Sequence, residues 1–180
     1  SVFGAAESGE PSALVKLAGV AADKAQPAIV RASALARLAG SGQFTRDFTQ
    51  RTSQDTSLLV RLATVQLADM MPAEARAAVL GPLLGDATRA VRIEAARSLA
   101  GGQDQLPQEL LPRWEAASQE YVTTLQYNAD RPESRVALGG FRAALGQADA
   151  AHAQFTAAIQ LDPEFVPAYV NAADVLRTQG

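Results

Sequence analysis

The sequence predicts an all-α protein, built as an α-solenoid in which helical hairpins stack on one another. Three observations support this fold class. The 180 residues are 48% hydrophobic but only 6% aromatic, and such an excess of small apolar residues favours closely packed helices over sheets. A Val-Arg pair recurs about every 30 residues up to residue 101, and a second pattern with a period of about 34 residues follows it.

The Val-Arg pairs mark the second helix of three predicted hairpins, because a Leu-Ala pair follows each of them at helical spacing. A further helical segment precedes each pair, at 11–23, 44–52 and 72–84. Pro72 suits a first helical turn, whereas Pro82 is expected to kink or end its helix. Each hairpin is too small to bury its own apolar face, so stacking is expected. The pairs are Val30-Arg31, Val60-Arg61 and Val91-Arg92.

An aspartate precedes the arginine by six residues in two of these units, as Asp55 before Arg61 and Asp86 before Arg92. An aspartate at that place can cap the second helix by accepting from its free N–H groups. The arginine can hydrogen-bond back to that carboxylate or to the carboxylate of a neighbouring unit. We therefore expect a structural ladder of Asp and Arg rather than a basic stripe that binds a ligand.

This arrangement of Asp, Val-Arg and Leu-Ala resembles the short HEAT-like repeat family, in which Asp and Arg stand at fixed places. The resemblance implies about three stacked hairpins over residues 1–104. The first unit departs from the pattern, because Asp23 lies eight residues before Arg31 and Pro27 intervenes. Irregular capping is therefore expected at that edge unit.

A second array is expected after residue 104. Residues 99–112 contain two glycines and two prolines and are interpreted as a junction. The segment 113–128 is predicted to be helical, and 132–163 is predicted to form two helices around Gly146. Phe155 and Tyr121 lie 34 residues apart, so 113–128 corresponds to the second helix of an earlier, degenerate repeat.

The stretch 132–165 resembles a complete tetratricopeptide repeat (TPR). The resemblance implies that 105–180 contains a degenerate half repeat, this full repeat and a truncated repeat over 166–180, in a right-handed superhelix. Gly139 and Ala151 are small enough for two helices to cross closely, and Phe155 fills the space beside them. The residues that carry the resemblance are Leu138, Gly139, Gly146, Ala151, Phe155, Ala158, Asp162 and Pro163.

The TPR resemblance also implies a concave groove that is lined by the first helix of each repeat. Some TPR proteins clamp a C-terminal carboxylate there with Lys and Asn. Val136 and Gly140 stand at those places in this chain, so no such clamp is expected. The groove residues implied by the resemblance are Val136, Gly140, Ala143, Val170, Asp174 and Arg177.

The sequence contains no arrangement of residues that points to catalysis. It has no cysteine, and His152 is its only histidine, so zinc, covalent haem and triad sites lack their ligands within this chain. The glycines of 139–146 lack the ending of a phosphate loop. We expect no enzyme activity, no catalytic or metal-binding residue and no cofactor.

Charge and hydropathy bear on the class of partner. The net charge is −3, with +1 in residues 1–104 and −4 in 105–180, so neither part has the basic footprint of a nucleic-acid binder. No apolar run approaches 18 residues, so no membrane insertion is expected. A protein or peptide is the expected partner.

The final predicted helix, about 166–178, carries a wide apolar face. Part of that face is expected to pack on residues 147–160, and the remainder to form an exposed edge that could mediate a homodimer. The residues of the face are Val166, Tyr169, Val170, Ala173 and Leu176.

The leading hypothesis is a non-catalytic protein–protein interaction scaffold. A narrower version of this hypothesis rests on similarity. The segment 128–177, together with the preceding HEAT-like units, resembles the C-terminal region of bacterial multihaem c-type cytochromes. That resemblance implies a periplasmic location, and without it the expected location is the cytoplasm. The alternatives are an enzyme and a nucleic-acid binder. Short HEAT-like repeats resemble those of bilin lyases, and a HEAT-like concave face can bind nucleic acid, but no residue here argues positively for either.

Overall fold

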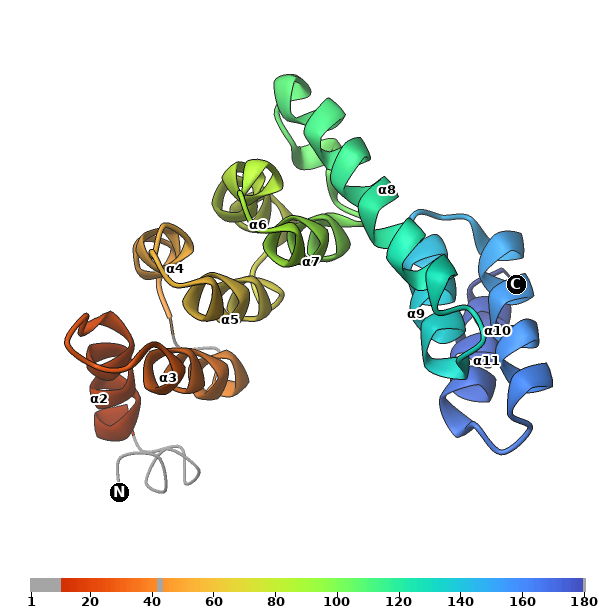
Figure 1. Cartoon of the computed structure of the whole chain (residues 1–180), viewed down its shortest axis with the longest axis horizontal. Helices are drawn as coiled ribbons and strands as arrows, with labels where there is room; N and C mark the ends of the chain where they lie inside the picture. Colours follow the sequence, from red (N-terminus) through yellow and green to blue (C-terminus); the bar gives the residue numbers. More distant parts are fainter. Residues whose placement is uncertain (1–10, 42–43, 180) are drawn as a thin grey trace. The chain divides into compact units, whose positions relative to one another are not determined.

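The computed structural model describes residues 11–41 and 44–179, and every regular element in those ranges is helical (Figure 1). Ten α-helices and three short 3₁₀ turns follow one another, without a strand in the described ranges. The predicted all-α class is therefore confirmed. The chain divides into two compact units, residues 1–114 and 115–180, so the division falls after Trp114 rather than after residue 104.

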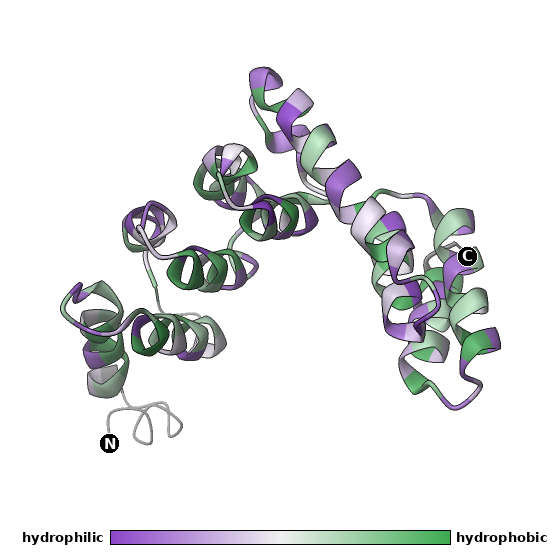
Figure 2. Cartoon of the chain, viewed as in Figure 1, coloured by the Kyte–Doolittle hydropathy of each residue, from purple (hydrophilic) through white to green (hydrophobic). Residues whose placement is uncertain are grey.

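The first unit consists of three helical hairpins joined in series. Within each hairpin the first helix packs on the second, and the second helices α3, α5 and α7 pack on one another in order. The helices of this unit carry polar and apolar sides (Figure 2). Their bounds are α2 (Pro11–Ala22), α3 (Ala28–Ser41), α4 (Arg46–Ser53), α5 (Leu58–Ala68), α6 (Ala73–Leu80) and α7 (Arg89–Leu99).

The repeated residues of the sequence form the core of this unit. Val60 and Val91 are fully buried and Val30 is half-buried, while the leucines of the three Leu-Ala pairs are inaccessible to solvent or nearly so. Helix α6 ends at Leu80, two residues before Pro82, and a 3₁₀ turn continues to Gly85. The ring of Pro82 cannot continue the backbone hydrogen-bond ladder of an α-helix.

The junction predicted over 99–112 contains two 3₁₀ turns, 103–105 and 108–110. Gly101 has a φ of 79°, which is a left-handed conformation that an L side chain would strain. Trp114 donates from Nε1 to the carbonyl oxygen of Ala96 at 3.2 Å. This hydrogen bond therefore anchors the start of the next helix to α7.

The second unit contains the remaining helices: α8 (Leu111–Tyr127), which spans the division after Trp114, α9 (Pro132–Ala144), α10 (Ala148–Leu161) and α11 (Val166–Gln179). α9 packs on α10, α10 packs on α11, and α9 also contacts α11. Gly146 makes the turn between α9 and α10 with a φ of 72°. Tyr121 of α8 meets Phe141 of α9 edge to face, with ring centroids 5.2 Å apart.

The buried face of α11 is not the one that the sequence predicted. Ala168 and Val175 are buried and Ala172 is half-buried, and Ala172 and Val175 pack with Ala151 and Phe155 of α10. All five residues of the predicted face are exposed, so that face is not the one that α11 buries. Small side chains allow α11 to approach α10 closely, whereas Tyr169 and Leu176 would hold the two helices apart.

Candidate functional site

The described ranges contain no group of three or more His, Asp or Glu side chains that could hold a metal ion. His152 lies half-buried on α10 without a second histidine anywhere in the sequence. No helix in the described ranges is long and apolar enough to cross a membrane. The notable features of the molecule are therefore its polar ladder and its surface hollows.

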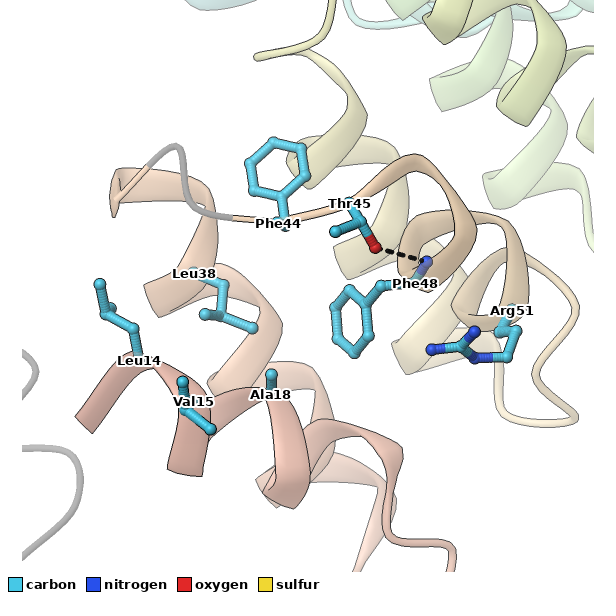
Figure 3. A pocket seen from close by; sticks show the side chains of 8 residues that line it. All are labelled: Leu14, Val15, Ala18, Leu38, Phe44, Thr45, Phe48 and Arg51. Atoms are coloured by element: carbon cyan, nitrogen blue, oxygen red, sulfur yellow. Dashed lines mark hydrogen bonds between the residues drawn. The ribbon is translucent and has the colours of Figure 1, made fainter. Parts of the chain in front are cut away.

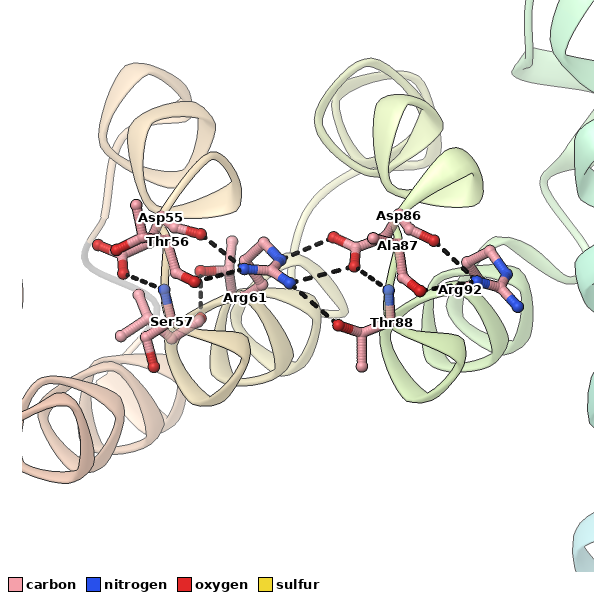
Figure 4. Close-up of polar contacts among 10 residues, drawn as sticks. Asp55, Thr56, Ser57, Arg61, Asp86, Ala87, Thr88 and Arg92 are labelled. Atoms are coloured by element: carbon pink, nitrogen blue, oxygen red, sulfur yellow. Dashed lines mark hydrogen bonds and ion pairs between the residues drawn. The ribbon is translucent and has the colours of Figure 1, made fainter.

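The Asp–Arg ladder comprises Arg31, Asp55, Arg61, Asp86 and Arg92, with the arginines on α3, α5 and α7. Figure 4 shows the part of the ladder from Asp55 to Arg92. Arg31 forms two bonds to the Asp55 carboxylate of the next hairpin, at 2.5 and 3.1 Å. Arg61 repeats this arrangement with Asp86, at 2.7 and 3.1 Å. Paired parallel bonds of this kind fix both distance and orientation between hairpins.

Each ladder arginine of the later hairpins also binds its own hairpin. Arg61 donates from Nη1 to the backbone carbonyl oxygens of Asp55 and Thr56, at 2.8 and 3.1 Å. Arg92 makes the equivalent bonds to the carbonyl oxygens of Asp86 and Ala87. The predicted return bond to the hairpin's own aspartate thus ends on a backbone oxygen, while the carboxylate binds the preceding hairpin's arginine.

The aspartates were predicted to cap the second helices, but in the structure they accept from residues that precede those helices. Asp55 accepts from the N–H of Ser57 at 2.9 Å, and Ser57 is itself the N-cap of α5. Asp86 accepts from the N–H of Thr88, the N-cap of α7, at 2.7 Å. Each carboxylate therefore shapes the turn before the helix instead of capping the helix, and it is also held by an arginine of the preceding hairpin.

The edge hairpin is more regular than expected at its arginine. Arg31 is buried and has an acidic partner in Asp55, although its own hairpin supplies only Asp23. Asp23 accepts from the N–H of Ala25 at 3.0 Å and so makes the same kind of turn as Asp55 and Asp86. The arginine's partner comes from the following hairpin, which the spacing within one hairpin could not reveal.

The ladder shifts the ionisation of its carboxyls. The Arg31 bond holds the pKa of Asp55 below its usual value, against the opposing effect of burial. For Asp86, burial by itself would raise the pKa, but the bonds from Arg61 and Thr88 outweigh it and the pKa is lowered. Both carboxylates are therefore charged at neutral pH and are fully engaged in holding hairpins together.

A pocket of about 290 Å³ lies between the first two hairpins and is called the inter-hairpin groove (Figure 3). α2 and α3 supply one part of the lining, and α4 with its lead-in supplies the other. Phe48 points from α4 toward α2, and Arg51 lies at one end of the group. The lining residues are Leu14, Val15, Ala18, Leu38, Phe44, Thr45, Phe48 and Arg51.

The groove exists because the first helices of the hairpins are unevenly packed. α4 packs directly on α6, whereas α2 and α4 make much less contact with each other. Phe44, in the segment that leads into α4, and Phe48 of α4 line the space between them, and Val15 opposite is 74% exposed. At about 300 Å³ a site is at the lower limit for a small-molecule pocket, so this groove fits one or two apolar side chains.

Arg51 is the polar group of the groove that is available to a ligand. No hydrogen bond or ion pair of its guanidinium is found among the residues that the structure describes. Thr45 is already engaged, because its side chain accepts from the N–H of Phe48 at 3.2 Å as the N-cap of α4. A second hollow shares Phe48 and Arg51 with the groove, and its lining adds Lys24 and the carboxylate of Asp55, which Arg31 already holds.

The groove predicted in the second unit is only partly open. Val136 and Ala143 pack against the core formed by Ala151, Phe155 and Val175. Gly140 faces open space, and Val170 is exposed. Asp174 and Arg177 form an exposed ion pair with each other at 3.0 Å, three residues apart on α11.

Sequence reasoning did not identify the inter-hairpin groove. The signal that could have found it was the pair Phe44 and Phe48, since two aromatic residues one turn apart are unusual in a chain with so few. No model of a protein family matches the chain, and neither curated proteins nor solved structures provide a significant match.

Proposed function

We propose that this protein is a non-catalytic protein–protein interaction scaffold. In this proposal the hairpins of the first unit are HEAT-like repeats, those of the second are TPR-like repeats, and both form an α-solenoid with a right-handed superhelical path. Support comes from the serial packing of α3, α5 and α7 and from the repeated sequence pattern. Proteins of this architecture act through the shape of their surface rather than through reactive groups.

The inter-hairpin groove is the observation that carries the proposal. Its apolar wall is large enough for one or two side chains, and the guanidinium of Arg51 lies at its end. A peptide segment with an aliphatic or aromatic side chain beside a carboxylate matches both features. An arginine pairs well with a carboxylate because its planar group can donate two parallel bonds.

The Asp–Arg ladder supports this function by holding the hairpins in register. The side chains of Arg31 and Asp55 are only 7% and 8% exposed, and they join the two hairpins that form the groove. A groove between rigidly joined elements loses less conformational entropy on binding than one between mobile elements. The ladder is thus a positioning device for the binding surface.

A site-specific crosslinking experiment tests the proposal. Because the chain has no cysteine, Val15→Cys introduces a single thiol at the groove, to which a photoreactive benzophenone is attached. The labelled protein is illuminated in an extract of the cells that naturally make it. We expect a discrete protein adduct that is retained under denaturing conditions and that can be identified by mass spectrometry.

Two controls make the result specific to the groove. Met70→Cys carries the same label at an exposed position outside the groove and should not give the same adduct. Arg51→Glu should abolish the adduct, whereas Arg46→Glu, an equal charge change on the same helix outside the groove lining, should leave it intact. An adduct that is absent, or that persists in Arg51→Glu, would contradict the proposal.

A narrower form of the proposal concerns the larger protein. By resemblance of the sequence, this scaffold would be the C-terminal interaction module of a periplasmic multihaem c-type cytochrome. The gene provides the test, since a cytochrome of that class needs CxxCH motifs upstream of these residues. An open reading frame that lacks such motifs would remove this version and leave the scaffold proposal standing.

A further inference from the structure

Helix α11 has two apolar faces, and only one of them is covered. Ala168, Ala172 and Val175 lie against the second unit, as described above. The other face is a continuous stripe that remains exposed, with exposed fractions of 66% for Val166, 46% for Tyr169 and 53% for Leu176. The C-terminal stripe is defined as Val166, Tyr169, Val170, Ala173 and Leu176.

The stripe follows the spacing of a coiled-coil seam. Four of its residues recur at alternating intervals of three and four along α11, which places Val166 and Ala173 at one heptad position and Tyr169 and Leu176 at the other, with Val170 beside this seam. A single exposed apolar residue is ordinary on a protein surface, but an ordered stripe with this period is typical of a helix that packs on another helix.

We propose that the C-terminal stripe binds the same stripe of a second copy of this chain, with the two α11 helices antiparallel. An antiparallel pair related by a two-fold axis near residue 171 forms four layers. Val166 meets Leu176 of the second copy, and Tyr169 meets Ala173 of the second copy; symmetry repeats both layers. Each layer joins a larger side chain to a smaller one, so the stripe is complementary to itself.

Charge favours the same direction. The residues before the N-terminus of α11 include the acidic Asp162 and Glu164, whereas its last turn contains Arg177. An antiparallel pair brings the acidic end of one helix to the arginine of the other, and it also aligns opposite ends of the helix dipoles. A parallel pair would place acidic ends together. Arg177 is exposed, and its bond to Asp174 lies on the helix surface, where it is readily exchanged.

Sedimentation of the full chain over a range of concentrations tests the association. We expect a reversible monomer–dimer equilibrium, and Leu176→Glu should weaken it about tenfold or more, because a carboxylate would be buried in two layers. Tyr127→Glu is the matched control. Tyr127 is 89% exposed on α8 of the same unit and lies outside the stripe, so its substitution should leave the equilibrium unchanged.

Cysteine crosslinking tests the antiparallel register. Chains with Val166→Cys alone or Leu176→Cys alone should form few disulfides, since their thiols lie at opposite ends of the pair. An equimolar mixture of the two chains should form heterodisulfides under mild oxidation. Circular dichroism of each variant checks that the helical content is unchanged.

The outcomes separate this proposal from the alternatives. A chain that remains monomeric at the highest soluble concentration would overturn it and leave the stripe for a helix of a different protein. Disulfides within the single-variant samples that exceed those of the mixture would also overturn it, because they indicate a parallel pair. Neither outcome affects the inter-hairpin groove, since that groove lies in the first unit.

Discussion

At the scale of single residues, two adjacent glycines in α9 have different roles. A Cβ placed on Gly139 would lie 2.7 and 2.8 Å from the Cδ1 and Cζ atoms of Phe155, which is too close for any real side chain. A Cβ on Gly140 would have nothing within 4 Å. Only the first glycine is required by packing, so the pair is a matched test of how closely α9 and α10 approach.

Gly139→Ala should destabilise the protein by about 1–3 kcal/mol, because the new methyl group forces Phe155 or the backbone to move. Gly140→Ala should stabilise it by up to about 1 kcal/mol, because alanine favours the helix and restricts the unfolded chain. Urea unfolding followed by circular dichroism measures both changes. Equal effects of the two substitutions would contradict the close approach at Gly139.

The buried ladder pair and the exposed pair of α11 offer a second comparison. Asp55→Ala leaves the buried Arg31 without its carboxylate and should cost about 3–5 kcal/mol. Asp174→Ala removes an exposed partner of Arg177 and should cost less than about 1 kcal/mol. Denaturant unfolding measures the loss of stability in both variants. A small effect of Asp55→Ala would show that the ladder does not hold the hairpins together.

At the scale of elements, the ladder makes the first unit sensitive to acid. The pKa values of Asp55 and Asp86 are lower in the folded protein than their usual values. A carboxyl of this kind stabilises the fold above its unfolded pKa, near 4, and this contribution is lost as the pH falls toward the folded pKa.

We therefore expect the free energy of unfolding of the first unit to fall as the pH is lowered below about 4. The double substitution Asp55→Asn and Asp86→Asn should lower stability at neutral pH and flatten this dependence, because neither amide titrates. Asp174→Asn, the same substitution in the second unit and outside the ladder, is the control for the chemical change itself. Thermal unfolding at a series of pH values gives the comparison, and an unchanged slope in the double variant would assign the acid sensitivity to other carboxyls.

At the scale of the whole molecule, the division into two compact units has a measurable consequence. Gly139→Ala should increase amide hydrogen exchange in α9, α10 and α11, because local stability depends mainly on contacts within a unit. Exchange in α3, α5 and α7 should stay as it is in the unsubstituted protein. Mass spectrometry of peptic fragments reports both regions, and a uniform increase would show that the chain unfolds as one cooperative body.

Much of the helical arrangement follows from local patterns in the sequence. The spacing of small apolar residues predicted the all-α class, Pro82 predicted the end of α6 and Gly146 the turn before α10, and in each case the structure agrees. These features depend on residues within a few positions of one another. Helical periodicity, proline geometry and positive-φ glycine act at that range.

The sequence by itself therefore determined that this protein is helical, where most of its helices lie and which aspartates and arginines are repeated. Only the tertiary structure decided that Arg31 binds the carboxylate of the next hairpin, that α11 buries its alanines instead of Tyr169, and that a groove opens beside Phe48. Each of these depends on how far apart two neighbouring helices pack. That distance is set jointly by side chains from separate hairpins, so no periodicity within one segment contains it.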